Sequence, residues 1–296
     1  MGRRAVSEDW STGWPAPGKL NLFLHVTGRR ADGYHLLQTV FQPLSVGDTL
    51  DFLPLDSDEI RLETPLPGVA PEQDLVMRAA RRLKAETGCG AGVTIRVRKS
   101  LPMGGGLGGG SSDAATTLVA LDHLWGLRLG MDRLAEIGLA LGADVPVFVR
   151  GRAAWAEGVG ELLTPMDLAE PWFLVIDPGV PVSTAALFSA PELTRNCPPI
   201  TIADFLSGRG VNIFEPLVRA RYPELDRAMA WLEQAAGHAR LTGTGACFFA
   251  RMPGPDDAGK LLDRLPAPWR GFVARGLNRS PLLDRLVRAD ARNPGS

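Results

Sequence analysis

The sequence lacks the features that would place it in a membrane or outside the cell. No stretch of 18 apolar residues occurs in the 296-residue chain, so no membrane-spanning helix is predicted. The first 14 residues contain no apolar segment like that of a secretory signal. Cys89, Cys197 and Cys247 are odd in number and far apart, and no Cys/His spacing typical of a metal site is present. We therefore expect free thiols in the cytoplasm, and no set of metal ligands in the protein.

An excess of positive charge is also missing. The 32 basic and 33 acidic side chains leave a formal net charge of −1. This balance argues against a general binder of nucleic acid or of membrane surfaces. We expect a small-molecule partner instead, while the sequence leaves monomer and homodimer equally open. Lysine is rare among the basic residues and occurs only as Lys19, Lys84, Lys99 and Lys260.

The length and the hydrophobic pattern predict a globular protein of two domains. A chain of 296 residues with 45% hydrophobic and 22% charged residues has the size and composition of about two folded units. Strand and helix patterns occur in both halves without regular alternation, which favours the α+β class. We expect a flexible tail over residues 1–14, a first domain over 15–165 and a second domain over 166–296.

Local periodicity predicts the elements within these domains. Alternating apolar residues are typical of strands, and apolar residues spaced three and four apart are typical of amphipathic helices. On these patterns we expect strands over 20–25, 93–98 and 172–176, helices over 75–83, 114–125 and 131–141, and extended chain over 145–149.

Glycine is the residue in excess. The chain has 34 glycines, above the usual share of about 7%, and six of them lie within residues 104–110. The strand pattern over 93–98 precedes this run, and the helix pattern follows it after Ser111-Ser112-Asp113, which we interpret as a helix cap. Glycines at a helix start let backbone N–H groups approach and bind phosphate. The run therefore predicts a phosphate-binding loop, with a flexible linker as the alternative.

Two familiar glycine motifs fit poorly. The GxxxxGK[ST] pattern requires a lysine after the last glycine, and here Ser111 follows Gly110. The GxGxxG pattern matches at 104–109, but a dinucleotide fold also needs a second strand that ends in an acidic residue about 20 positions later. The region around Asp132 is instead predicted to be helical. A dinucleotide-dependent oxidoreductase is therefore a remote alternative.

Five ordered segments resemble motifs of the GHMP kinase superfamily. Three resemble motifs of the whole superfamily: 15–22 (PAPGKLNL), 102–112 (PMGGGLGGGSS) and 241–247 (LTGTGAC). Two more, 28–39 (GRRADGYHLLQT) and 142–148 (GADVPVF), resemble the member that phosphorylates a cytidine-diphosphate-linked sugar alcohol. The resemblance spans about residue 15 to about residue 280.

The resemblance implies a fold and a reaction. The fold is a two-domain GHMP kinase fold: an N-terminal domain like the second domain of ribosomal protein S5, and a ferredoxin-like C-terminal domain. The expected reaction uses ATP and Mg²⁺ to phosphorylate the 2-hydroxyl of the sugar alcohol, in the non-mevalonate route to isoprenoid precursors. Phosphoryl transfer of this kind depends mainly on positioning and on stabilisation of charge.

The resemblance also implies roles for individual residues. Asp144 is the expected general base and Lys19 is its partner. For the substrate, Tyr34 and Phe188 are expected to stack on cytosine and His35 to bind its edge. The other expected substrate contacts are Asn21, Thr184, Thr244 and Gly245. The expected ATP contacts are Pro102, Met103, Gly104, Gly105, Gly106, Leu107, Gly108, Gly109, Gly110, Ser111 and Ser112.

Some positions depart from the family pattern, and other functions remain open. Asp74 and Asp122 stand where asparagine is usual, and Ile213 stands where an acidic residue is usual, which leaves the affinity in doubt. Asp113 could hold the helix start or a magnesium ion. Another GHMP kinase, such as a homoserine or mevalonate kinase, is the main alternative. A non-catalytic nucleotide sensor is a further alternative, although a sensor would be expected to lose Lys19 or Asp144.

Overall fold

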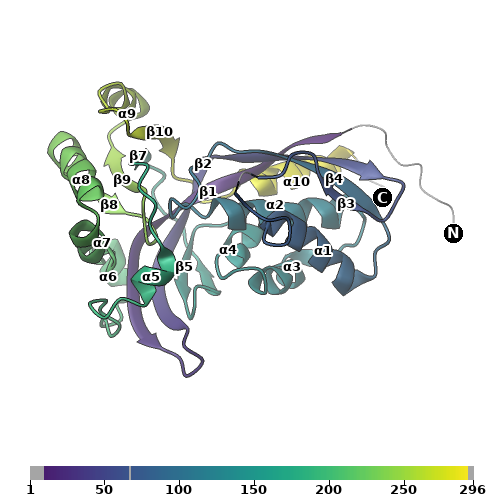
Figure 1. Ribbon diagram of the computed structural model, residues 1–296, viewed down its shortest axis with the longest axis horizontal. Helices are drawn as coiled ribbons and strands as arrows, with labels where there is room; N and C mark the ends of the chain where they lie inside the picture. Colours follow the sequence, from purple (N-terminus) through teal and green to yellow (C-terminus); the bar gives the residue numbers. More distant parts are fainter. Residues whose placement is uncertain (1–9, 67, 293–296) are drawn as a thin grey trace.

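A computed structural model describes residues 10–66 and 68–292 of the chain (Figure 1). The strands are β1 (Ser11–Arg29), β2 (His35–Leu55), β3 (Ile60–Leu62), β4 (Gly92–Arg98), β5 (Ala154–Glu157), β6 (Leu162–Pro165), β7 (Trp172–Asp177), β8 (Arg240–Leu241), β9 (Phe248–Met252) and β10 (Arg270–Arg275). The helices are α1 (Leu75–Thr87), α2 (Gly109–Leu124), α3 (Gly130–Leu139), α4 (Val145–Arg150), α5 (Thr184–Phe188), α6 (Ile202–Leu206), α7 (Glu215–Arg221), α8 (Pro223–Ala236), α9 (Pro255–Leu262) and α10 (Pro281–Arg292).

The first sheet is built around the long antiparallel hairpin of β1 and β2. One edge of β2 pairs with β1 along nearly its whole length, from the register Arg29↔His35 to Ser11↔Phe52. The other edge of β2 is shared by β5 near its start and β4 near its end. β3 and β6 complete the order β3-β4-β2-β5-β6. The hairpin therefore runs through the molecule and connects its two lobes (Figure 1).

Helices α1–α4 and α10 pack with the first sheet around one hydrophobic core. Trp14 and Phe52 from the strands and Leu118 from α2 are fully buried in this core, and Leu282 from α10 lies in it too. The tail expected over residues 1–14 is therefore wrong from Ser11 onward, because this segment pairs with β2 and buries Trp14. Residues 1–9 lie outside the described part of the chain. We call the first sheet with these helices the first unit. The domain expected over 166–296 also needs correction, because its last helix, α10, packs on this first unit.

The second sheet is antiparallel, in the order β10-β7-β9-β8. Its core gathers strand residues such as Leu174 and Phe248 with Leu225 and Met229 of α8. Mixed strands and helices in two packed units confirm the expected α+β class. Among the described residues, no helix is both long and apolar enough to span a bilayer.

The two units share a buried junction. Leu24 of β1 belongs to the core of the second unit, while Leu20 packs in a central cluster with Leu107 and Phe249. Because β1 passes between the two units, both of its faces are covered. Asn21 is consequently 3% exposed, although its alternation with leucines is typical of an exposed strand position.

Local sequence signals explain both ends of α1. Asp74 accepts hydrogen bonds from the N–H groups of Val76 and Met77, and α1 ends at Gly88 with a φ of 67°. The prediction for α2 is wrong at its start, because Gly108 is the N-cap and residues 111–113 lie inside the helix.

The segment over 145–149 is a helix, not extended chain. α4 begins after Asp144, has a proline in its first turn and ends at Gly151 with a φ of 59°. Every residue from Val145 to Val149 is buried. A short apolar run covered on all sides shows neither a helical nor a strand period, so its sequence cannot distinguish the two.

Candidate active site

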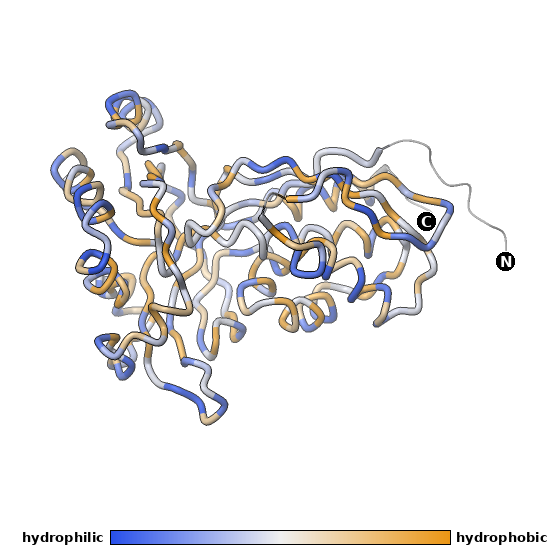
Figure 2. Tube along the Cα trace, viewed as in Figure 1, coloured by the Kyte–Doolittle hydropathy of each residue, from blue (hydrophilic) through white to orange (hydrophobic). Residues whose placement is uncertain are grey.

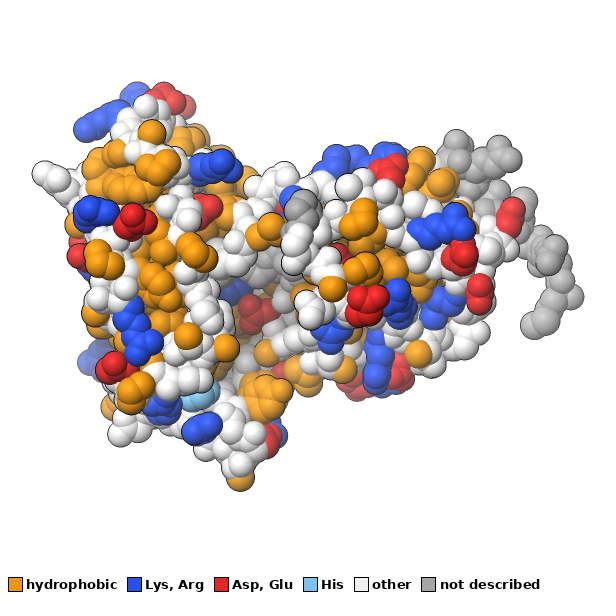
Figure 3. Space-filling view, in the orientation of Figure 1, with side chains coloured by type: hydrophobic (Ala, Val, Ile, Leu, Met, Phe, Trp, Pro, Cys, Tyr) orange, Lys and Arg blue, Asp and Glu red, His pale blue; other side chains and the backbone are white. Residues whose placement is uncertain are grey.

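A cavity of about 880 Å³ opens at the junction of the two units. One side is formed by β1, β2 and the hairpin tip that joins them. The other sides come from the glycine loop (residues 104–110), the start of α4, the region of α5 and the 243–244 segment. The space-filling view shows a hollow between the two lobes with acidic and basic side chains inside it (Figure 3). The hairpin tip that reaches this region is hydrophilic (Figure 2). Side chains from segments far apart in the sequence therefore converge here.

Lys19 is the buried cation of this cavity, with 3% of its surface exposed. Its backbone N–H donates to the carbonyl oxygen of Leu107 at 3.0 Å, which joins β1 to the glycine loop. Its Nζ donates to Oδ1 of Asn21 and to the carbonyl oxygen of Gly106 at 3.1 Å, and it lies 3.4 Å from Oδ2 of Asp144. The ammonium is therefore surrounded by oxygen acceptors that hold it in one place.

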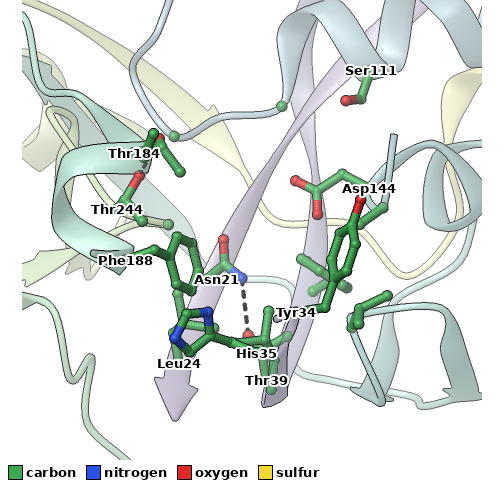
Figure 4. A pocket seen from close by; sticks show the side chains of 18 of the residues that line it. Asn21, Leu24, Tyr34, His35, Thr39, Ser111, Asp144, Thr184, Phe188 and Thr244 are labelled. Carbon is green, nitrogen blue, oxygen red and sulfur yellow. Dashed lines mark hydrogen bonds between the residues drawn. The ribbon is translucent and has the colours of Figure 1, made fainter. Parts of the chain in front are cut away.

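Asp144 faces Lys19 from the start of α4. Although it is the N-cap residue, its side chain makes no capping hydrogen bond. The side chain is 35% exposed, and its carboxylate points into the cavity (Figure 4). The carboxylate is thus held by one cation and open to a ligand on its other side.

Asn21 is fixed by three hydrogen bonds. Besides accepting from Lys19, its side chain donates from Nδ2 to Oγ1 of Thr39 at 3.0 Å (Figure 4). Its backbone N–H donates to Oγ1 of Thr242, also at 3.0 Å. Thr39 also lines the cavity, and the sequence prediction missed it. Only the pairing of β1 with β2 places Thr39 beside Asn21.

Aromatic side chains stand on two sides of the cavity. Tyr34, in the hairpin turn, is 64% exposed. His35 and Phe188 lie opposite it (Figure 4), with their ring centroids 4.9 Å apart. Phe188 also packs edge-on against Phe214, at 4.8 Å. One wall is therefore a supported aromatic pair, while the other is a single exposed ring.

Two arginines that the sequence did not single out line the same end of the cavity. They are Arg29 and Arg195. Nε of Arg195 donates to Nε2 of His35 at 3.2 Å. Burial lowers the pKa of His35, and the charges of Arg195 and Arg29 lower it further. His35 is therefore neutral at neutral pH.

The third superfamily motif, residues 241–247, only partly lines the cavity. Thr184 and Thr244 line it and are joined by a hydrogen bond of 2.7 Å between their hydroxyls. Gly245 was expected there too, but it is not among the lining residues. A Cβ at Gly245 would lie 3.2 Å from the side chain of Leu241, in the core of the second unit. This position therefore serves packing.

The glycine loop separates the central cavity from a second cavity of about 390 Å³. Residues 102–111 all line this second cavity, together with Asp74, Lys99 and Asp113. Gly106, Gly108 and Ser111 also line the central cavity, so a ligand could pass along the loop from one to the other.

The last residue expected to bind ATP, Ser112, does not line either cavity. It is fully buried and donates to the carbonyl oxygen of Pro17 at 2.7 Å. This serine therefore attaches α2 to β1, and that expectation is corrected.

Tertiary packing explains glycine at two positions of the loop. Gly106 has a φ of 77°, and a Cβ on it would lie 2.3 Å from the carbonyl oxygen of Thr242. Gly108 has a φ of 72°, and a Cβ there would lie 2.7 Å from the ring of Phe148. The loop is thus glycine-rich partly because it packs directly against the third motif and α4.

Lys99 lies between two buried carboxylates under the loop. Its Nζ donates to Oδ2 of Asp48, and to Oδ2 of Asp113 at 2.8 Å. Burial opposes the charge on Lys99, but Asp113 and Asp48 outweigh it and raise the lysine pKa. Burial also raises the pKa of Asp113 to about 7, against the attraction of Lys99. Asp113 thus pairs with Lys99 and lies inside α2, so it does not cap the helix.

The three residues that depart from the family pattern lie in different parts of the structure. Asp74 caps α1 and lines the second cavity, where its Oδ2 is buried without a hydrogen bond. Asp122 accepts a hydrogen bond from the N–H of Leu129 at 3.0 Å. Ile213 packs against the second core. Only Asp74 of these three touches either cavity of the site.

The chain matches family models, curated proteins and a solved structure over most of its length. The family models "GHMP kinases N terminal domain" and "GHMP kinases C terminal" match residues 74–152 and 199–271. A 4-diphosphocytidyl-2-C-methyl-D-erythritol kinase of Nitrosococcus oceani is 58% identical, over 92% of this chain and 97% of that protein. The kinase of the same name from Ectopseudomonas mendocina is 60% identical, over 92% of this chain and 93% of that protein. A crystal structure of 4-(cytidine 5'-diphospho)-2C-methyl-D-erythritol kinase superposes with a TM-score of 0.77 at 34% identity, over 89% of this chain and 98% of that one.

Proposed function

The chain belongs to the 4-diphosphocytidyl-2-C-methyl-D-erythritol kinases of the GHMP kinase family, and we propose that its central cavity is where the phosphoryl transfer takes place. The reaction moves the γ-phosphoryl group of ATP to the 2-hydroxyl of the cytidyl substrate, in the non-mevalonate route to isoprenoid precursors. The observation that carries this assignment is the contact of Lys19 with both Asp144 and the glycine loop. It puts a cation and a carboxylate where the two cavities meet.

The second cavity and the loop are suited to ATP. The loop leads directly into the N-terminus of α2, which is 16 residues long and directs free N–H groups toward a phosphate. With the base and ribose in the second cavity, the phosphates would follow Gly106 and Gly108 toward Lys19. The nearly neutral chain then needs no broad basic surface, because helix dipole and backbone amides supply most of the attraction.

Asp144 is suited to act as general base. Its carboxylate is exposed on the cavity side and can accept the proton of the 2-hydroxyl as the oxygen attacks the phosphorus atom. Lys19 orients Asp144 and places a positive charge beside the transferred group, where negative charge is spread over the phosphoryl oxygens. A sensor that only bound nucleotide would have no need of this pair.

The site also fits a magnesium ion held mainly by phosphate. Within residues 10–66 and 68–292, no three His, Cys, Asp or Glu side chains gather as a ready metal cluster. Mg²⁺ commonly keeps several waters and binds one or two carboxylates together with substrate phosphates. Asp144 at the start of α4 and the hydroxyl of Ser111 in the first turn of α2 both line the central cavity and could each contribute an oxygen ligand. Bound Mg²⁺ would neutralise charge on the phosphates.

The aromatic walls suit the cytidine end of the substrate. Tyr34 and Phe188 stand on opposite sides of the cavity (Figure 4), so we expect a flat base to stack between them and His35 to meet its edge. The hydroxyls of Thr184 and Thr244 and the amide of Asn21 lie on the way to Asp144, where the diphosphate and sugar alcohol would extend. Homoserine and mevalonate contain no aromatic base, so these walls favour the cytidyl substrate over the alternatives.

An ATP-consumption assay with three acceptors tests this function. We expect turnover with 4-diphosphocytidyl-2-C-methyl-D-erythritol and at most background rates with homoserine and mevalonate. Detection of the 2-phosphate product by ³¹P NMR would establish the site of transfer. Equal or faster phosphorylation of homoserine or mevalonate would reject the assignment.

A further inference from the structure

Arg195 stands out among the cavity residues because of the contacts of its guanidinium group. Nη2 donates to the carbonyl oxygens of Phe188 and Ala190 at 2.8 and 2.7 Å, and Nη1 donates to that of Leu193 at 3.1 Å. The Nε–H group points at Nε2 of His35 at 3.2 Å. The group is therefore fixed by backbone oxygens on one side and by an imidazole nitrogen on the other.

This contact determines where the proton of His35 resides. A guanidinium has only donors, so Nε2 of His35 must be the acceptor. A neutral imidazole with an unprotonated Nε2 carries its proton on Nδ1. Protonation of His35 would place a second N–H against that of Arg195, and burial with the charges of Arg195 and Arg29 disfavours it as well. Nδ1 forms no hydrogen bond with any described residue, so its N–H is available to a ligand.

We propose that Arg195 is a positioning residue that makes this kinase selective for cytosine over uracil. By holding His35 in the Nδ1–H form, it presents a donor to the ring edge of the base. Cytosine offers an acceptor at N3, whereas N3 of uracil carries a hydrogen; O2 accepts in both bases and does not distinguish them. Uracil would place two donors against each other, and an imidazole free to change tautomer would remove that conflict. This proposal rests on the proposed function, because it requires a cytidine substrate in the cavity.

A matched pair of variants separates this role from simple packing. Arg195→Lys keeps a side chain with donors only, so Nε2 of His35 remains an acceptor. Arg195→Gln places an amide at a similar distance; its oxygen can accept from Nε2–H and its NH2 can donate to Nε2, so His35 is no longer restricted to the Nδ1–H form. Both variants lose the guanidinium contacts to the three backbone carbonyls. Thermal unfolding of both establishes that the comparison is made on folded protein.

The first measurement is the tautomer of His35 in the protein without substrate. Long-range ¹H–¹⁵N NMR distinguishes the two neutral forms, and His35→Gln assigns the signals among the four histidines of the chain. We expect the Nδ1–H form in the unchanged protein and in Arg195→Lys, and a shift toward the Nε2–H form in Arg195→Gln. The Nε2–H form in the unchanged protein would overturn the proposal, whatever the enzyme phosphorylates.

The second measurement is the ratio of kcat/KM for the cytidyl substrate to that for its uridine-diphosphate analogue. We expect Arg195→Gln to lower this ratio by roughly 10- to 100-fold, the range that an unpaired buried donor costs, and Arg195→Lys to retain most of it. If both variants reduce turnover of the two substrates equally, Arg195 serves packing only and the proposal is wrong. Absence of turnover with the cytidyl substrate in the unchanged protein would instead refute the proposed function.

Discussion

The two charged residues at the centre of the cavity differ in how far they are enclosed. The side chain of Lys19 is 4% exposed and that of Asp144 is 35% exposed. Lys19 is held by the amide of Asn21 and a loop carbonyl, so it cannot turn away when a substrate enters. Asp144 keeps an open side on which a hydroxyl can approach. This asymmetry suits a fixed cation beside an accessible base.

Replacement of Asp144 tests its proposed role as general base directly. We expect Asp144→Asn to lower kcat by about 10²- to 10⁴-fold, because an amide cannot accept the hydroxyl proton. Steady-state kinetics should show a much smaller change in the KM for the cytidyl substrate. Asp132→Asn is a suitable control, since Asp132 is 85% exposed and lies outside both cavities. Near-normal turnover of Asp144→Asn would exclude general-base catalysis by this residue.

The cluster of Lys99, Asp48 and Asp113 combines one ammonium with two carboxyl groups. Asp48 also accepts hydrogen bonds from the N–H groups of Ser100 and Leu101, at 2.6 and 2.8 Å. Asp113 has no such backbone donors, and its Oδ1 is buried without a hydrogen bond. This difference explains why burial raises the pKa of Asp113 to about 7.

The raised pKa predicts how stability depends on pH. The folded chain keeps a proton on Asp113 that the unfolded chain releases near its usual pKa of about 3.9. Asp113 therefore makes the free energy of unfolding fall as the pH rises from about 4 to 7, and Asp113→Asn removes this contribution.

Urea unfolding of the unchanged protein and of Asp113→Asn at several pH values measures this effect. We expect the difference in unfolding free energy, variant minus unchanged protein, to rise by ~2 kcal/mol between pH 5 and 7 and then to level off. Parallel pH profiles for the two proteins would contradict the assigned pKa.

At the scale of elements, the glycine loop and the third motif form one packed unit. The N–H of Cys247 donates to the carbonyl oxygen of Gly105 at 3.1 Å, and Gly243 lies against Gly106. Two segments about 140 residues apart thus meet through their backbones. The position of the loop relative to the substrate cavity therefore depends on the second unit.

This packing predicts a large effect from one methyl group. Gly106→Ala would place a Cβ 2.3 Å from the carbonyl oxygen of Thr242, so one of the two segments must move. We expect kcat/KM for ATP to fall on the order of 10²-fold, since displacements of about 1 Å cost this much.

The matched control is Gly259→Ala in α9, where nothing lies within 4 Å of the added Cβ. This variant should keep its activity and gain up to ~1 kcal/mol of stability, because alanine favours a helix over glycine. Equal kinetics for the two variants would refute the packing argument.

At the scale of the whole molecule, the two units are not divided at a single point in the chain. The β1–β2 hairpin starts in the first unit and reaches the core of the second, where Leu24 and Val26 are buried. In the other direction, α10 follows the second sheet and returns to pack beside β1 and α2 (Figure 1). The two units are therefore interlocked, and the cavity between them is held by elements of both.

Because α10 packs on the first unit, truncation of its buried side chains should destabilise that unit. Leu282 is 1% exposed in the core of the first unit, whereas Val287 on the same helix is 56% exposed. Leu282→Ala should lower the free energy of unfolding by about 2–5 kcal/mol, the usual cost of such a truncation in a core.

Val287→Ala serves as the control and should change the stability by less than ~0.5 kcal/mol. Hydrogen exchange should show the loss of protection in the first unit, around α2 and β1. Exchange that increases only in the second sheet would contradict this assignment of α10.

The sequence by itself determined the local chemistry of this protein. Residue type and spacing indicated the phosphate loop between a strand and a helix, and the resemblance to the GHMP kinases indicated roles for Lys19, Asp144, Tyr34 and His35. The sequence also predicted the α+β class, since periodicity depends on neighbours a few positions apart.

Only the tertiary structure decided what lies next to these residues. It buried Asn21, made α4 a helix, returned α10 to the first unit and brought Arg195 to His35. It also moved Ser112 and Gly245 out of the site. Each of these results depends on contacts between segments distant in the chain, which no local pattern of residues records.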